Sequence, residues 1–150
     1  MDKKRKLSFG IIPDGCWKVN LHELLPESAW NFIKKDVKSR AAGKCEICGK
    51  NIDRLDAHEV WSFDEKRCVQ KLENIIAVCR DCHDSIHINR SYLVGRGEKA
   101  EDNYMKVNGV SYAEMKADLK AANEKNTERN AVSEWKLDLS YLKKYENQKC

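Results

Sequence analysis

The fold of this chain is decided by two short stretches, CEICG at residues 45–49 and CRDCHDSIH at residues 79–87. Each stretch begins with a C-x-x-C pair, and two such pairs supply the four thiolates of a closed tetrahedral zinc site. The chain holds seven cysteines, and an odd count without a secretory signal argues for metal rather than for a disulfide framework. We therefore predict one structural zinc ion, with four ligands: Cys45, Cys48, Cys79 and Cys82.

The residues around these pairs refine the prediction. Gly49 allows the tight turn by which backbone amides face the first pair of sulfurs. Residues 49–78 separate the pairs, which is more than a minimal zinc ribbon needs, so the zinc site encloses a further element. The cysteines without a partner at such spacing are interpreted as free thiols: Cys16, Cys68 and Cys150.

Three of the four histidines predict a second metal site. His83 and His87 are four residues apart, so on a helix they share one face and can hold a single ion. His58 lies on an expected strand inside the enclosed segment, where a hairpin can bring it to the same face. His22 lies outside this unit and is interpreted as a surface residue.

The order of these residues resembles the HNH endonuclease superfamily with a zinc knuckle. The resemblance covers residues 45–90 and rests on His58, Asn74 and the His-x3-His ending at His87. The stretches AHEVW (57–61) and VNGV (107–110) are also similar to uncharacterised bacterial HNH proteins. The resemblance implies a ββα-metal core, in which a two-stranded hairpin and a helix hold one divalent ion, Mg²⁺, Mn²⁺, Ni²⁺ or Zn²⁺. It also implies that this ion polarises the scissile phosphate while a general base activates water.

Carried over residue by residue, the resemblance gives His58, His83 and His87 the metal positions. Asn74 matches the residue that orients the hairpin loop and the base. Asp56, one strand period before His58, is a candidate for contacting one of the ligands.

The general-base position departs from the family pattern. The base is usually a histidine directly after the first metal-binding histidine, and here that residue is Glu59. Either Glu59 is the base, or another group replaces it, or efficient catalysis has been lost. A second alignment makes His58 the base, but it puts Ala57 at a metal position, where alanine can bind nothing.

The fold class expected from these patterns is α+β: a small ββα-metal core with a helix before it and a helical extension after it. The expected domains are a basic arm and irregular lead-in (1–26), the HNH domain with its preceding helix (27–90) and a helical accessory extension (91–150). Helical periodicity predicts helices over 27–41, 82–89, 98–107 and 112–128, the last opened by a capping box of Ser111 and Glu114. Alternation and apolar runs predict strands near 18–21 and over 55–61, 69–79 and 135–139, with a loop at 62–66.

Composition and charge limit the kinds of partner that this protein can have. The net charge of +4 suits a nucleic-acid partner, and a basic run covers Lys3 to Lys6. No apolar stretch is long enough to cross a membrane, so we expect no membrane partner. We expect a cytoplasmic location.

We predict a metal-dependent endonuclease that acts on DNA. One alternative is a degenerate HNH fold that binds nucleic acid or a protein partner without cutting. The other is a purely structural two-zinc protein, which has no open coordination position at the histidines.

Overall fold

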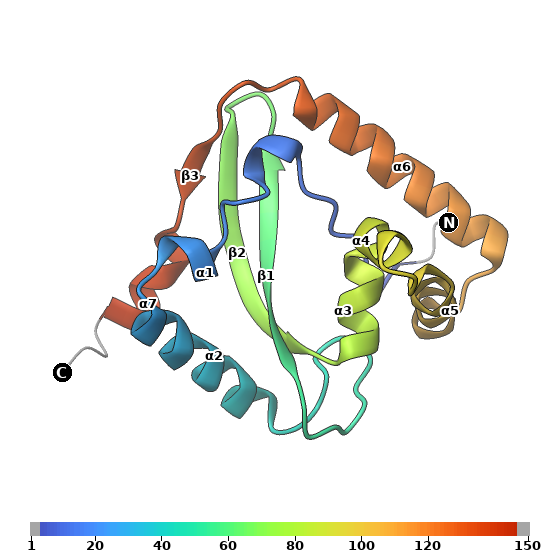
Figure 1. Ribbon diagram of the computed structural model, residues 1–150, viewed down its shortest axis with the longest axis horizontal. Helices are drawn as coiled ribbons and strands as arrows, with labels where there is room; N and C mark the ends of the chain where they lie inside the picture. Colours follow the sequence, from blue (N-terminus) through green and yellow to red (C-terminus); the bar gives the residue numbers. More distant parts are fainter. Residues whose placement is uncertain (1–3, 147–150) are drawn as a thin grey trace.

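The computed structural model describes residues 4–146, and the expectations for Lys3 and Cys150 lie outside this range. The fold is mixed α+β, with helices around a three-stranded sheet (Figure 1). In chain order the elements are η1 (Asp14–Cys16), α1 (Leu21–Leu24), α2 (Glu27–Ala41), β1 (Asp56–Asp64), β2 (Val69–Val78), α3 (Arg80–Ile86), α4 (Ile88–Leu93), α5 (Gly97–Asn108), α6 (Tyr112–Asn130), β3 (Lys136–Asp138), η2 (Ser140–Leu142) and α7 (Lys143–Glu146).

A long antiparallel hairpin of β1 and β2 forms the centre of the molecule. Its register shifts between Val60 and Trp61, so that Glu73 is an extra residue on β2. Since an extra residue reverses the alternation of a strand, Leu72 stays on the buried side with Ile75 and Ala77. β3 pairs with β2 in parallel, which leaves β1 as an edge strand.

The hairpin is longer than the sequence predicted. β1 continues to Asp64 through most of the expected loop. Ser62 donates a hydrogen bond to Glu73 across the strands, at 2.8 Å. Phe63 packs edge-to-face on Trp135, with ring centroids 5.4 Å apart. Trp135 is distant in sequence, so this extension depends on tertiary contact.

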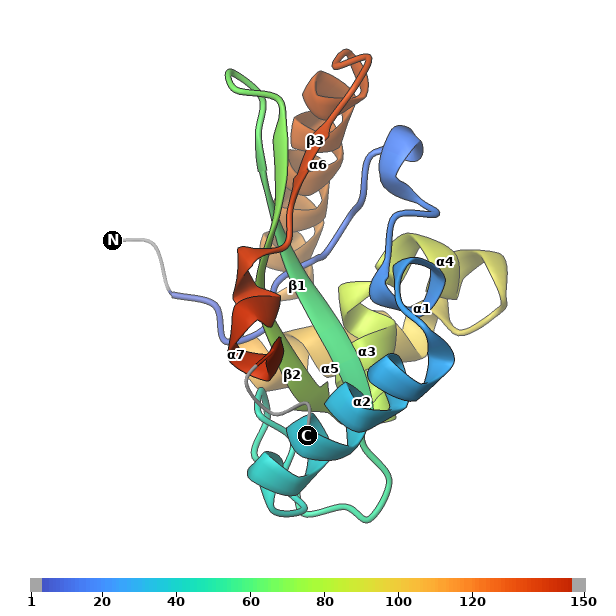
Figure 2. The same ribbon diagram turned by 90° about the vertical axis from the view of Figure 1, so that its left-hand side faces the viewer.

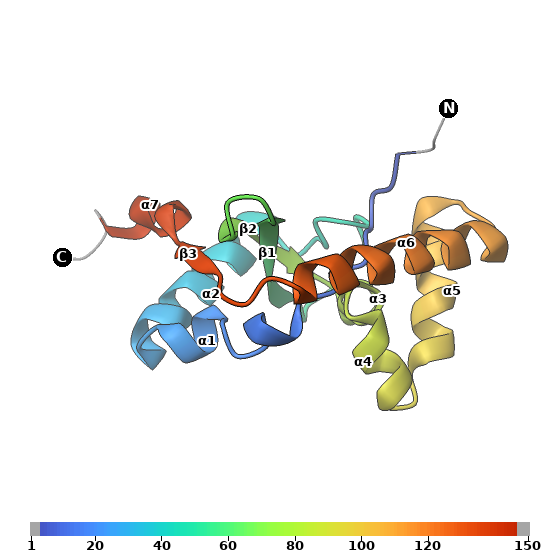
Figure 3. The same cartoon turned by 90° about the horizontal axis from the view of Figure 1, so that it is seen from above.

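The helices lie on both sides of the hairpin. Figure 1 shows α2, α7 and β3 on one side and α3 to α6 on the other. The view in Figure 3 confirms this separation, with α1, α2 and α7 at one end and α4, α5 and α6 at the other. Figures 1 and 2 show the C-terminal end of α6 near the tip of the hairpin, where Arg129 pairs with Glu65 at 3.2 Å. Within residues 4–146, no helix is both long and apolar enough to cross a bilayer.

The predicted helices are largely confirmed. α2 buries Trp30, Ile33 and Val37, the stripe that its periodicity indicated. The capping box of Ser111 and Glu114 opens α6. The strand expected near 18–21 is wrong: α1 begins there instead, because the Asn20 side chain caps it by accepting a hydrogen bond from the Glu23 amide at 3.0 Å.

The lead-in before α1 is packed against the helices. Leu7 is fully buried, and the Asn108 side chain holds its backbone with hydrogen bonds to both its amide and its carbonyl. Phe9 stacks on Tyr104 at a centroid distance of 4.1 Å. Gly10 then passes so close to α3 that a Cβ there would lie 2.7 Å from the Ile86 side chain. The lead-in therefore crosses the end of α3 at a fixed position.

This crossing also divides the helix expected over 82–89. The Ile86 carbonyl accepts a hydrogen bond from the Gly10 amide at 2.8 Å, and a continuous helix would need that acceptor for residue 90. The chain turns at His87, with ψ of 51°, and α4 begins at Ile88.

Candidate metal centres and the adjoining pocket

The four cysteines of the two C-x-x-C pairs meet at one end of the hairpin. Their sulfurs lie within 4.8 Å of one another, and three of the four residues are buried. The Sγ atoms of Cys48 and Cys79 are 3.8 Å apart. Sulfurs bound tetrahedrally to zinc at about 2.3 Å are about 3.8 Å apart. The cluster could therefore hold a metal such as zinc.

The two pairs are built alike and are tied together. The amide of Cys48 donates to the Cys45 sulfur, and that of Cys82 to the Cys79 sulfur, each at 3.5 Å. Gly49 has the positive φ, 77°, that its turn requires. Glu46 joins the pairs by bonding Ala77 twice, through its amide at 2.9 Å and its carboxylate at 2.6 Å.

Hydrogen bonds and burial shift the pKa values of these thiols in different directions. The hydrogen bond from Cys82 and the backbone amides lower the pKa of Cys45, while the same bond and burial raise the pKa of Cys82. Burial likewise raises the pKa of Cys79. A bound cation would stabilise all four sulfurs as thiolates.

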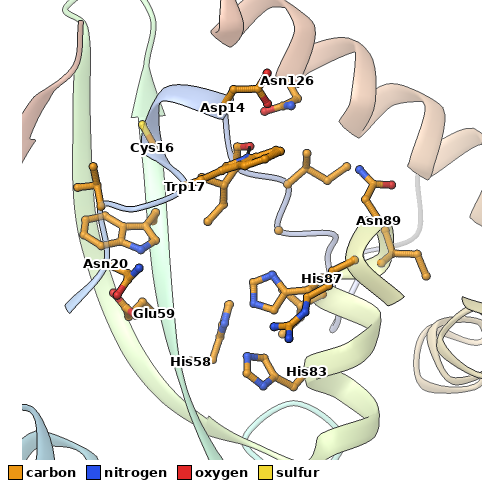
Figure 4. Close-up of a pocket in the computed structure, with 18 of the residues that line it drawn as sticks. Asp14, Cys16, Trp17, Asn20, His58, Glu59, His83, His87, Asn89 and Asn126 are labelled. Carbon is orange, nitrogen blue, oxygen red and sulfur yellow. Dashed lines mark hydrogen bonds between the residues drawn. The ribbon is translucent and has the colours of Figure 1, made fainter. Parts of the chain in front are cut away.

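The three predicted histidines converge between β1 and α3. His58 comes from β1, His83 from α3 and His87 from the residue after α3, and their ring nitrogens lie within 4.8 Å of one another. Their ring centroids are 4.9–5.4 Å apart, and Figure 4 shows the rings facing a common space. Imidazole nitrogens on one tetrahedral ion are about 3.4 Å apart, so small ring rotations would let all three bind it.

Asp56 fixes the orientation of one of these rings. Its Oδ2 lies 3.1 Å from Nδ1 of His83, and both side chains are about three-quarters buried. A carboxylate accepts hydrogen bonds, so the contact favours the tautomer with the proton on Nδ1 and a free lone pair on Nε2. The candidate role of Asp56 beside a ligand is supported by this contact.

The environment favours the neutral form of two of these histidines, His58 and His87. Burial and the two neighbouring imidazoles lower the pKa of His58 to about 3. Burial, His83 and Arg90 lower the pKa of His87 to about 4. Neutral imidazoles are the form that binds metal. Within residues 4–146, no carboxylate joins the three as a fourth ligand, so the group could hold an ion with a coordination position open.

Glu59 lines the same pocket as the histidines but is held from the lead-in side. Its Oε1 accepts a hydrogen bond from the Leu21 amide at 2.8 Å. Burial raises the pKa of its carboxyl, although this bond opposes the shift. Figure 4 shows Glu59 beside Asn20, with His58 between it and the other two imidazoles.

Asn74 is not brought to the histidines. It pairs with Val60 on the hairpin and is exposed. Its Oδ1 accepts from the Tyr141 hydroxyl at 3.0 Å and from the Ile75 amide at 2.8 Å. The structure thus links Asn74 to the η2 segment.

A cavity of about 720 Å³ opens over the histidines. Four segments wall it: residues 10–20 of the lead-in, the 57–61 part of β1, the 83–93 part of α3 and α4, and Asn126 of α6. Trp17 and Arg90 also line it, and sequence reasoning missed both. Neither stands in a motif, and only the path of the lead-in over α3 brings them to one cavity.

No family model, curated protein or solved structure matches the chain.

Proposed function

We propose that this protein is a metal-dependent endonuclease of the HNH type that hydrolyses phosphodiester bonds in DNA. The observation that carries the proposal is the convergence of His58, His83 and His87 on one wall of an open cavity. Three imidazoles that, within residues 4–146, have no fourth protein ligand beside them are the donor set of a catalytic rather than a structural site. The β1–β2 hairpin followed by α3 supports a ββα-metal core, because the three ligands come from these elements.

The residues around the cavity have complementary roles in this proposal. The three histidines hold the ion, and Asp56 fixes the His83 ring so that Nε2 faces it. A divalent ion bound there would polarise the scissile phosphate and stabilise the leaving oxygen. The cysteine cluster holds a zinc ion that fixes the start of α3, since Cys79 caps that helix and Cys82 lies within it.

Glu59 is the proposed general base. It lines the cavity, and burial raises the pKa of its carboxyl toward the range in which a base works near neutral pH. Its Oε1 is engaged by Leu21, while Oε2 has no hydrogen-bond partner within residues 4–146. Oε2 is therefore the atom that would take the proton from the attacking water. Asn74 supports catalysis in this proposal only through the hairpin, because its carboxamide contacts Tyr141.

One observation favours the alternative of a binding module without catalysis. The bond between Glu59 and the Leu21 amide gives Glu59 a structural role in holding the lead-in. A protein that had lost its general base would keep this bond and both metal sites. The purely structural alternative is less favoured, since Asp56 contacts His83 rather than completing a closed site.

The test is cleavage of supercoiled plasmid and of single-stranded DNA by zinc-loaded protein, with Mg²⁺, Mn²⁺, Ni²⁺ and Zn²⁺ added in turn. We expect nicking with at least one ion, and we expect His83→Ala to abolish it while the cysteine-bound zinc and the fold are kept. Glu98→Ala is the control, because Glu98 is exposed on α5 and does not line the cavity. Wild-type protein that cuts neither substrate with any ion would contradict the proposal.

A further inference from the structure

The cavity over the histidines has two chemically different ends. The imidazoles occupy one end, together with Arg90, which lies close enough to His87 to lower its pKa. The Arg90 side chain makes no ion pair or hydrogen bond within residues 4–146, so this cation is free to meet an anion. A phosphate at this end would lie beside the candidate metal ligands and could accept hydrogen bonds from the Arg90 guanidinium.

The other end suits an aromatic base. Trp17 is 68% exposed, yet its indole Nε1 donates to the Ile12 carbonyl at 2.9 Å, which holds the ring in place. Figure 4 shows Trp17 across the cavity from the imidazoles, with Asp14 and Asn126 beside it. The Oδ1 of Asn126 is a buried acceptor without a donor in the part of the chain that the structure describes. The exposed Asp14 carboxylate at this end disfavours a second phosphate and favours the amino groups of a base.

The walls limit what can enter. The cavity volume of about 720 Å³ lies within the range of about 300–1,000 Å³ that takes a small molecule or a single nucleotide. The lead-in crosses the cavity from α3 to β1, and the contacts of Gly10 with Ile86 and of Leu21 with Glu59 fix the two ends of the crossing. If the entering base were paired, its complementary strand would collide with these walls. The walls therefore exclude a paired nucleotide.

We propose that this cavity takes one unpaired nucleotide, with its base stacked on Trp17 and its phosphate between Arg90 and the imidazoles. The inference rests on the proposed function and assigns it a substrate class: single-stranded DNA, or DNA with an unpaired nucleotide, in preference to continuous duplex. Stacking on an exposed aromatic ring tolerates any base, so Trp17 selects for an unpaired strand rather than for a sequence.

The experiment measures binding and cleavage separately. A fluorescent single-stranded oligonucleotide, the same strand in a duplex and a duplex with one bulged nucleotide are titrated by anisotropy at low salt, without added divalent ion. The same three substrates are then cleaved in the ion that supports nicking. We expect the single-stranded and bulged substrates to bind and react at least about 10-fold better than the duplex.

Trp17→Ala should remove about 10-fold or more of the affinity for the unpaired substrates and raise KM more than it lowers kcat, because it removes a stacking surface. Trp17→Phe should restore most of the affinity. Tyr112→Ala is the matched control, since Tyr112 is another exposed aromatic residue but lies at the opposite end of α6 from Asn126. Arg90→Gln should weaken binding of all three substrates.

The outcomes separate the two proposals. Unpaired substrates that bind preferentially through Trp17 but are never cut would overturn the nuclease activity and leave the cavity assignment standing. Duplex that binds and reacts as well as the single strand, with Trp17→Ala unchanged, would overturn the cavity assignment and leave the nuclease standing. No binding to any oligonucleotide would overturn both.

Discussion

The carboxylate of Asp56 lies 3.1 Å from Nδ1 of His83, and this contact joins the first residue of β1 to the helix that follows the hairpin. It links the two elements that supply the imidazoles. It also selects the nitrogen that the His83 ring presents, since a proton held on Nδ1 would leave Nε2 for a metal ion.

Asp56→Asn should weaken the binding of an ion to the three histidines without unfolding the protein. The amide keeps the size of the carboxylate but can donate to Nδ1, so the preferred tautomer is lost. We expect affinity for the second ion to fall about 10- to 100-fold, measured by calorimetric titration of Mn²⁺ or Ni²⁺ into zinc-loaded protein. Asp53→Asn, at an exposed position three residues earlier, is the control. Equal affinities in the two variants would show that Asp56 has no part in orienting the ligand.

Cys79→Ser should remove one tightly held zinc ion per chain. Cys79 is both a sulfur donor and the cap of α3, so the variant loses the metal and disorders the helix that carries His83. We expect a large fall in melting temperature, with zinc content measured by elemental analysis after dialysis. Cys68→Ser should change neither quantity, because Cys68 lies at the hairpin turn outside the cluster. Full zinc content in Cys79→Ser would refute the four-cysteine site.

Glu59→Gln should reduce cleavage by about 10²- to 10⁴-fold if Glu59 is the general base. Glutamine can still accept the bond from the Leu21 amide, so the lead-in should remain in place and DNA binding should be kept. Glu59→His should preserve or raise activity, because imidazole titrates near neutral pH. Single-turnover cleavage rates measure both effects.

The Glu59 variants also separate the two proposed functions. An inactive wild type together with an active Glu59→His variant would identify a binding protein that has lost its base. Cleavage by Glu59→Gln at the wild-type rate would show that Glu59 is not the general base. His58 would then be the next candidate for that role.

The metal-free histidine site should make the protein sensitive to acid. The folded-state pKa of His87, about 4, lies below its ordinary value of 6.5, so between these values only the unfolded chain takes up the proton. This contribution leaves stability constant above about pH 6.5 and lowers it as the pH falls toward 4. Between pH 7 and 5, we expect wild type to lose as much as about 2 kcal/mol more free energy of unfolding than His87→Gln.

Urea denaturation at the two pH values, after removal of the ion at the histidines, measures this difference. Both proteins carry the same cysteine cluster, so its acid sensitivity cancels. Equal losses in the two proteins would mean that burial of His87 does not perturb its protonation.

Local patterns alone were sufficient to predict the two C-x-x-C pairs and the shared face of His83 and His87 as candidate metal ligands. C-x-x-C spacing and the four-residue interval between His83 and His87 are properties of a turn and of a helix, so they can be recognised without knowledge of the fold. The same holds for α2 and for the capping box of α6, whose signals lie within a few residues.

Only the tertiary structure decided how the site is enclosed. The lead-in lacks periodicity, and its path is set by contacts with residues far along the chain, such as the hydrogen bonds from Asn108 to Leu7 and from Gly10 to Ile86. The bond between Gly10 and Ile86 divides the expected helix at His87. The path of the lead-in also brings Trp17 to the cavity, across from the imidazoles, and the Leu21 amide to Glu59. Sequence spacing therefore determined which residues could bind metal, because ligand geometry is local. The shape of the cavity beside them depends on long-range packing, which no local pattern encodes.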